Sequence, residues 1–123
     1  MLFRSRQAVI RLALACLLTL TACAPALQLA QGERASLTRD GQSILLSNPG
    51  PDTAEAPALL IVGTVTGLPD VCRPRSAGVW GCVLPDVPAG KLYRVGFTGT
   101  VSAGSVTFYR ASAGIRPVYL ELP

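Results

Sequence analysis

The sequence ASLTRDGQSILLSN at residues 35–48 gives the clearest indication of the fold. Two segments with alternating apolar and polar residues, 35–39 and 42–48, flank Asp40-Gly41, and an Asp-Gly pair in that position is a strong hairpin signal. Five similar segments follow between glycine- and proline-containing turns: 58–66, 78–84, 92–101, 105–110 and 118–122. Because nothing after residue 22 shows a helical period with caps, these seven short strands predict a β-sandwich.

The same alternation predicts which side chains meet between the two sheets. One apolar face carries Trp80, Cys82 and Leu84, and another carries Tyr93, Val95 and Phe97. A turn is expected at residues 102–104, Ser-Ala-Gly, before the segment that carries Val106 and Phe108.

The N-terminal segment has the order of a signal peptide. Arg4, Arg6 and Arg11 precede the uncharged run LALACLLTL at residues 12–20. Nine residues fit the apolar core of a signal peptide, whereas a membrane-spanning helix needs about 20. The alternative is a buried N-terminal helix of a cytosolic domain.

Leu20-Thr21-Ala22-Cys23 resembles the lipobox of bacterial lipoproteins. The resemblance implies that residues 1–22 are removed, that Cys23 is acylated, and that the protein is anchored outside the cytoplasm. Residues 23–34 would then be the lipidated cysteine with a tether, although Leu27 and Leu29 leave open a first strand, and residues 35–123 would be the folded domain. Ordinary cleavage with a free cysteine is the alternative. Ala24, in place of Asp, favours the outer membrane if the cell has two membranes.

The charge balance argues against nucleic acid as a partner. Three of the eleven basic residues but none of the seven acidic ones lie in residues 1–22, so the remaining chain carries a net charge of only +1. A nucleic-acid-binding surface usually shows a basic stripe, whereas the charges here are sparse and mixed.

Cys72 and Cys82 are the two cysteines left once Cys16 departs with the signal and Cys23 takes the lipid. In an oxidising compartment a disulfide between them is the expected state, with two free thiols as the alternative. Zinc usually requires four ligands in short paired spacing, and the chain contains no histidine.

No catalytic constellation is evident, so we expect no enzyme, no metal and no cofactor. Without histidine, neither a Ser-His-Asp nor a Cys-His arrangement can form. Asp40, Asp52 and Asp70 lack the spacing of a calcium site. Asp70 and Asp86 lie beside prolines in turns, where short acidic side chains cap backbone groups.

Three segments resemble the Ig-like "conserved repeat" domains of bacterial surface proteins. They are Asn48-Pro49-Gly50-Pro51-Asp52-Thr53-Ala54, Gly67-Leu68-Pro69 and Cys82-Val83-Leu84-Pro85-Asp86-Val87-Pro88-Ala89-Gly90. The resemblance spans about residues 40–110 and implies a seven-stranded antiparallel Ig-like β-sandwich. In that family a strand ends at the asparagine, the next follows the alanine, and a cysteine near the position of Cys72 pairs with the one at Cys82.

The expected function is that of a structural or interaction module of the cell envelope. The predicted loop at residues 72–78 carries Arg73 and Arg75, and with Arg116 it is the candidate surface for an envelope protein or polysaccharide. The simpler interpretation is a solvated loop that the cross-link only stabilises and that binds no partner. The alternative function is a small-ligand or carbohydrate-binding module that uses Trp80, Tyr93, Tyr109 or Tyr119 as a platform.

Overall fold

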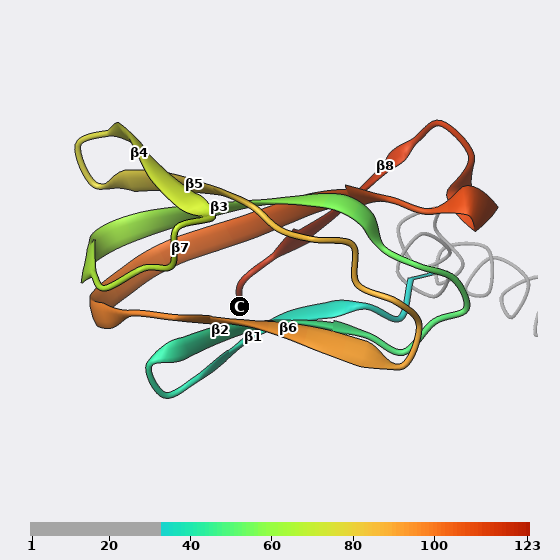
Figure 1. The fold of residues 1–123 in the computed structure, drawn as a ribbon, viewed down its shortest axis with the longest axis horizontal. Helices are drawn as coiled ribbons and strands as arrows, with labels where there is room; N and C mark the ends of the chain where they lie inside the picture. The colour runs from blue at the N-terminus through green and yellow to red at the C-terminus, as the bar shows by residue number, and fades with distance from the viewer. Residues whose placement is uncertain (1–32) are drawn as a thin grey trace, which may run out of the picture. The chain divides into compact units, whose positions relative to one another are not determined.

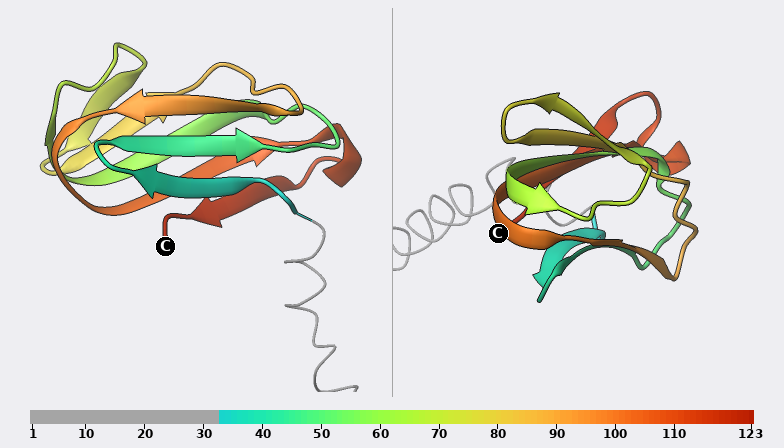
Figure 2. Two further views of the ribbon diagram at one scale, coloured as in Figure 1. Left: turned by 90° about the horizontal axis from the view of Figure 1, so that it is seen from below. Right: turned by 60° about the vertical axis from the view of Figure 1, so that its left-hand side comes forward.

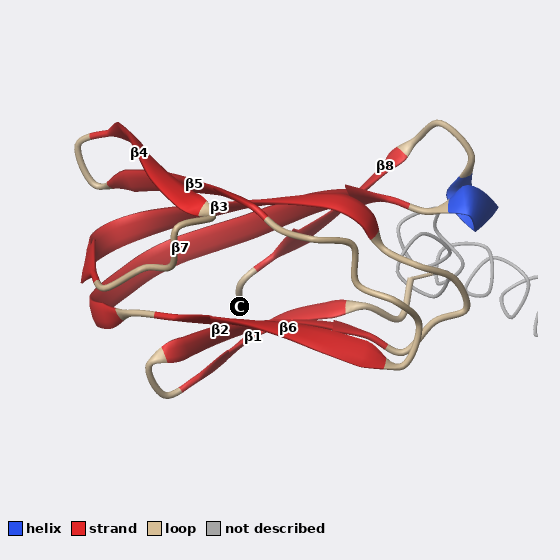
Figure 3. Cartoon of the chain, viewed as in Figure 1, coloured by secondary structure: helices blue, strands red, loops and turns tan. Residues whose placement is uncertain are grey.

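The computed structural model describes residues 33–123, in which the chain forms β-strands and one short 3-10 helix (Figures 1 and 3). These elements are β1 (Ser36–Asp40), β2 (Ser43–Asn48), β3 (Glu55–Thr66), β4 (Cys72–Ser76), β5 (Val79–Val83), β6 (Lys91–Gly96), β7 (Thr98–Tyr109), η1 (Ala111–Ala113) and β8 (Pro117–Glu121). The predicted signal segment 1–22 and Cys23 lie outside the described residues. Within residues 33–123, no helix has the length and apolar character needed to cross a membrane.

The strands form two sheets that pack against each other (Figure 2). The smaller sheet has the order β1-β2-β6, and the larger has the order β4-β5-β3-β7-β8, with antiparallel neighbours throughout. The chain passes between the sheets after β2, after β5 and after β6. The predicted all-β class and the pair of packed antiparallel sheets are therefore confirmed.

The first hairpin forms where the Asp-Gly pair predicts it, with a shift of one residue. Asp40 pairs with Ser43, so Gly41 and Gln42 make the two-residue turn. Gly41 has φ +58°, a conformation that glycine adopts without the steric cost of a side chain.

The predicted number of seven strands is wrong, because the described chain has eight. Residues 72–76, predicted as part of a loop, form β4 and pair with β5. The predicted strand at 92–101 is divided at Phe97, where the chain leaves the smaller sheet.

The turn predicted at residues 102–104 is also wrong, because β7 continues through them. Ala103 and Gly104 pair with Val62 and Ile61 of β3, and Ser102 is the extra residue of a bulge opposite the Val62–Gly63 step. Small residues are typical of turns, but here the equally long partner strand β3 pairs with β7 on both sides of the bulge.

The core lies between the two sheets and is built mainly from alternate residues of the long strands. Its largest fully buried apolar side chains are Phe108, Ile44, Leu46, Ile61, Val95 and Val106. Phe97 is buried as predicted, whereas Trp80 and Tyr93 are only partly buried against the core. They are therefore less enclosed than alternation alone suggested.

The predicted disulfide is confirmed and joins directly paired residues of β4 and β5. In Figure 1 this hairpin stands away from the smaller sheet, and Cys72 is the only buried residue of β4. The β4–β5 hairpin therefore buries few side chains of β4 against the core, and the disulfide stabilises it in place of that packing.

Candidate binding surface

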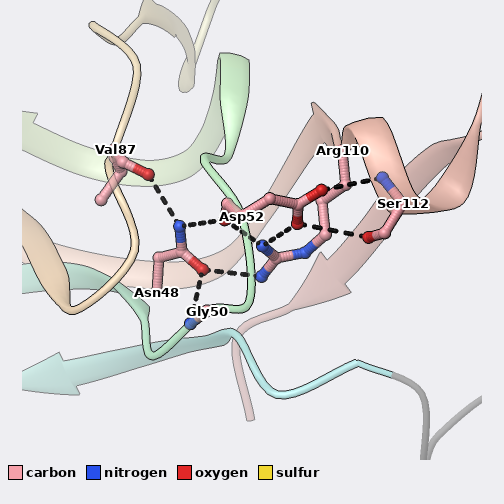
Figure 4. A network of polar contacts seen from close by, with 6 residues as sticks. All are labelled: Asn48, Gly50, Asp52, Val87, Arg110 and Ser112. Atoms are coloured by element: carbon pink, nitrogen blue, oxygen red, sulfur yellow. Dashed lines mark hydrogen bonds and ion pairs between the residues drawn. The ribbon is translucent and has the colours of Figure 1, made fainter.

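A polar cluster of Asn48, Asp52, Arg110 and Ser112, in which Asn48 and Arg110 are buried, lies where β2 and β7 end (Figure 4). Asn48 has no exposed surface, and its amide Nδ2 donates to the carbonyl oxygens of Val87 at 2.7 Å and Asp52 at 3.0 Å. Its Oδ1 accepts from the Gly50 amide at 3.2 Å and from Arg110 Nη2 at 2.8 Å. One side chain thus holds the loop from β2 to β3 against two other segments.

Arg110 and Asp52 are the charged pair of this cluster. Arg110 Nη1 donates to the Asp52 carbonyl at 2.6 Å and to its Oδ1 at 3.2 Å. The guanidinium lies 5.2 Å from the centre of the Phe108 ring, within cation–π range. The Asp52 carboxylate also accepts from the backbone N–H of Ser112 at 2.8 Å and from its hydroxyl at 3.2 Å.

These contacts lower the pKa of the Asp52 carboxyl group, chiefly through the backbone N–H of Ser112. Partial burial opposes the shift, while the Ser112 hydroxyl and Arg110 reinforce it. Within residues 33–123, every buried polar side-chain atom has a hydrogen-bond partner. The cluster is therefore a satisfied structural tie between the two sheets.

The outward face of the five-stranded sheet is a different environment. The strand register aligns Val83, Ala58, Thr107 and Tyr119 in one row, and Arg73, Gly81, Leu60, Ser105 and Glu121 in the next. A shallow hollow of about 840 Å³ lies over these rows. A smaller hollow of about 230 Å³ shares Leu60, Ser105 and Tyr119 with it, so the two form a continuous trough.

Arg73 and Arg75 form the basic side of the trough. Both are exposed on β4 and line the larger hollow together with Asp70. The stem of Arg75 lies across Gly81, where an added Cβ would be 3.0 Å from Arg75 Cδ. Within residues 33–123, neither arginine side chain makes an ion pair or a hydrogen bond, so both guanidinium groups are available to a ligand.

Tyr119 lines the opposite side of the trough, and Tyr109 is exposed on the neighbouring strand outside it. Tyr119 on β8 is 58% exposed, and its hydroxyl donates to Glu121 Oε1 at 3.0 Å. Tyr109 on β7 is 44% exposed and is paired with Pro117, two positions along β8 from Tyr119. Both rings are thus presented on strands at the same side of the sheet.

The structure brings together two of the three arginines predicted as a partner-binding surface. Arg116 precedes β8, whereas Arg73 and Arg75 are on β4, and three strands of the same sheet lie between β4 and β8. Asp86, predicted as a cap, accepts from the Ala56 amide at 2.8 Å.

Sequence reasoning missed both the Arg110 cluster and the trough. Alternation placed Val106 and Phe108 on the inner face, and one further step of two places Arg110 there as well. The trough depends on which strands are neighbours, and no local pattern of residues reveals that order.

The described residues contain no group of three or more histidine, cysteine, aspartate or glutamate side chains placed to hold a metal ion. Comparisons of the chain with protein-family models, with curated proteins and with solved structures found no match.

Proposed function

We propose that this chain is a lipid-anchored interaction module of the bacterial cell envelope, which binds an envelope protein or polysaccharide through the trough. The observation that carries the proposal is that Arg73 and Arg75, which have no partner among residues 33–123, line one hollowed surface together with the exposed Tyr119. A merely solvated sheet face has no need for this separation of a basic side from an aromatic side.

The trough is also preorganised. The Cys72–Cys82 disulfide fixes the strand that carries Arg73 and Arg75, and Gly81 leaves room for the Arg75 stem to lie flat. A surface that is ordered before binding loses less conformational entropy when a partner arrives. This favours recognition over a purely structural role.

We assign the finer fold as Ig-like on the strength of the family resemblance. Two features support the assignment: β2 ends at Asn48 and β3 begins directly after Ala54, and the chain crosses between the sheets in that interval. The Asn48 contacts give the asparagine of this segment a physical role, because they hold the connecting loop.

The lipid anchor at Cys23 belongs to the same proposal and rests on the lipobox. Intact mass measurement of the native protein should give the chain from Cys23 to Pro123 plus acyl groups. A soluble form that starts at Ala24 or earlier would contradict the anchor without affecting the proposed binding surface.

The binding surface is tested by photo-crosslinking of the full chain in cells that make it. Val83, 75% exposed at the rim of the hollow, is replaced by p-benzoylphenylalanine, and the matched control carries it at Ile115, which is 95% exposed outside the hollow. We expect a high-mass adduct from position 83 that disappears with Arg73→Glu and Arg75→Glu but persists with Arg116→Glu. Equal labelling from both positions, or none from position 83, would refute the proposed surface.

A further inference from the structure

We infer that the occupant of the trough is an acidic polysaccharide, bound through sugar carboxylates at Arg73 and Arg75 and through neutral sugar faces at Tyr119. This inference rests on the proposed function and names its ligand class. Guanidinium groups recognise carboxylates through paired, charge-assisted hydrogen bonds. Aromatic rings stack on the apolar C–H faces of sugars, which makes the two sides of the trough complementary to one polymer.

The dimensions favour a polymer over a small molecule. β4 and β8 are the first and fifth strands of the sheet, so four inter-strand spacings of about 4.8 Å separate them by about 19 Å. Arg75 reaches inward over Gly81 on β5, which reduces the span from Arg75 to Tyr119 to about 14 Å. A ligand that contacts both sides must therefore contain several sugar units, and the second hollow beyond Leu60 and Ser105 extends the path further.

The floor of the trough favours a glycan over an extended peptide. Peptides usually bind sheets along an edge strand, where unpaired backbone groups supply the hydrogen bonds. Here the ligand would cross the centre of the sheet, where β3 is paired on both sides. The floor instead offers the half-buried Ser105 and Thr107, whose side-chain hydroxyl groups match those of sugars.

The charge pattern distinguishes a sparsely acidic glycan from a nucleic acid. Asp70 lines the larger hollow and Glu121 the smaller one, so a strand with a phosphate at every unit would meet negative charge at both. A polymer that carries a carboxylate on some units and neutral rings on others fits two arginines at one side and Tyr119 at the other.

Binding is measured by calorimetry with the full lipidated chain in detergent micelles. The probes are acidic oligosaccharides of four to six units that contain galacturonate, glucuronate or mannuronate, each paired with its carboxyl-reduced neutral counterpart. We expect at least one acidic member to bind, its reduced counterpart to bind about tenfold more weakly, and its affinity to fall as salt is raised.

Variants separate the roles of the two sides. Arg73→Ala, Arg75→Ala and Tyr119→Ala should each weaken binding by about fivefold or more, while the matched controls Arg116→Ala and Ile115→Ala stay within about twofold. Asp70→Asn should tighten binding, because it removes a negative charge from the larger hollow; a residue with only a structural role would not produce such a gain.

Two results would overturn the inference. One is that no acidic oligosaccharide binds; the other is that an acidic peptide or single-stranded DNA of equal charge binds as tightly as the best sugar. If the crosslink at position 83 persists in either case, the surface remains a binding site and only its ligand class is wrong. If that crosslink is also absent, the proposed function fails with it.

Discussion

Arg110 and the pair Arg73 and Arg75 show two opposite uses of the same side chain in one sheet. Arg110, which directly follows β7, is 3% exposed and hydrogen-bonded to Asp52 and Asn48. Arg73 and Arg75, on β4, face outward across a hollow. The role of an arginine here therefore depends on its burial and on the partners within reach, and residue type alone does not predict it.

The physical basis of the contrast is solvation. A buried guanidinium must recover inside the protein the hydrogen bonds that it loses to water, and Arg110 does so through Asn48 and Asp52. An exposed arginine keeps its water and contributes little to stability. Arg73 and Arg75 therefore retain their hydrogen-bonding capacity for a ligand.

The strongest test of this contrast is Arg110→Ala. It removes three hydrogen bonds of the buried guanidinium, two to Asp52 and one to Asn48, so the free energy of unfolding should fall by about 3–5 kcal/mol. Arg110→Lys should fall between the wild type and Arg110→Ala, because lysine keeps the charge but not the planar fork. Urea unfolding followed by Trp80, the only tryptophan, measures the change.

Arg34→Ala is the matched control, since Arg34 is exposed and precedes β1. Its unfolding free energy should stay within about 0.5 kcal/mol of the wild type. If Arg110→Ala behaves like this control, the cluster does not hold the sheets together and the contrast is lost.

The second largest effect is expected from the disulfide that supports the exposed arginines. Replacing Cys72 and Cys82 by alanine removes the link that closes the short β4–β5 hairpin, which costs about 2.5–3 kcal/mol in the chain-entropy model. Thermal unfolding of the wild type with and without reductant should show the same loss. An unchanged melting temperature after complete reduction would mean that packing alone holds the hairpin.

Most of the fold can be predicted from the sequence, because local residue patterns encode it. Alternation and turn residues identify both strands of the first hairpin, and the cysteine pair is recognisable from composition. Local patterns fail where tertiary pairing overrides them. β4 is charged and contains a proline, and β7 runs through Ser102-Ala103-Gly104, because the neighbouring strands β5 and β3 supply the hydrogen bonds.

The candidate site is less predictable from sequence for a different reason. Arg73 and Arg75 are close in the chain and could be selected together, but Tyr119 joins them only through the strand order of the larger sheet. Arg116 shows the converse. The sequence allowed it to lie near the predicted loop at residues 72–78, but the strand order places it at the opposite edge of the sheet. Spatial grouping across five strands is a property of topology.

A smaller, pH-dependent effect should come from Asp52. Because the folded state lowers its pKa, ionised Asp52 contributes stability above about pH 4, and that contribution is lost as the pH falls through the folded pKa. Asp52→Asn should therefore be less stable than the wild type at neutral pH, and the two should converge in acid. Melting temperatures between pH 7 and pH 2 measure this.

Ser112→Ala isolates one part of the same effect, because it removes the hydroxyl donor but keeps the backbone N–H that contributes most to the shift. Its acid transition should lie between those of the wild type and Asp52→Asn. Parallel pH profiles for wild type and Asp52→Asn would show that the carboxylate adds no pH-dependent stability.

The smallest change in stability is expected at the exposed pair, where the functional effect is expected to be large. Arg73→Ala combined with Arg75→Ala should alter the unfolding free energy by no more than about 0.5 kcal/mol, because neither guanidinium has a partner within residues 33–123. The same variant should lose the crosslink at position 83. A loss of stability as large as that of Arg110→Ala would mean that these arginines help to hold the fold together. It would also remove the main reason to regard the trough as a binding surface. Unchanged stability with a lost crosslink would show that one sheet uses arginine on its inner side to hold the fold together and on its outer side to bind a partner.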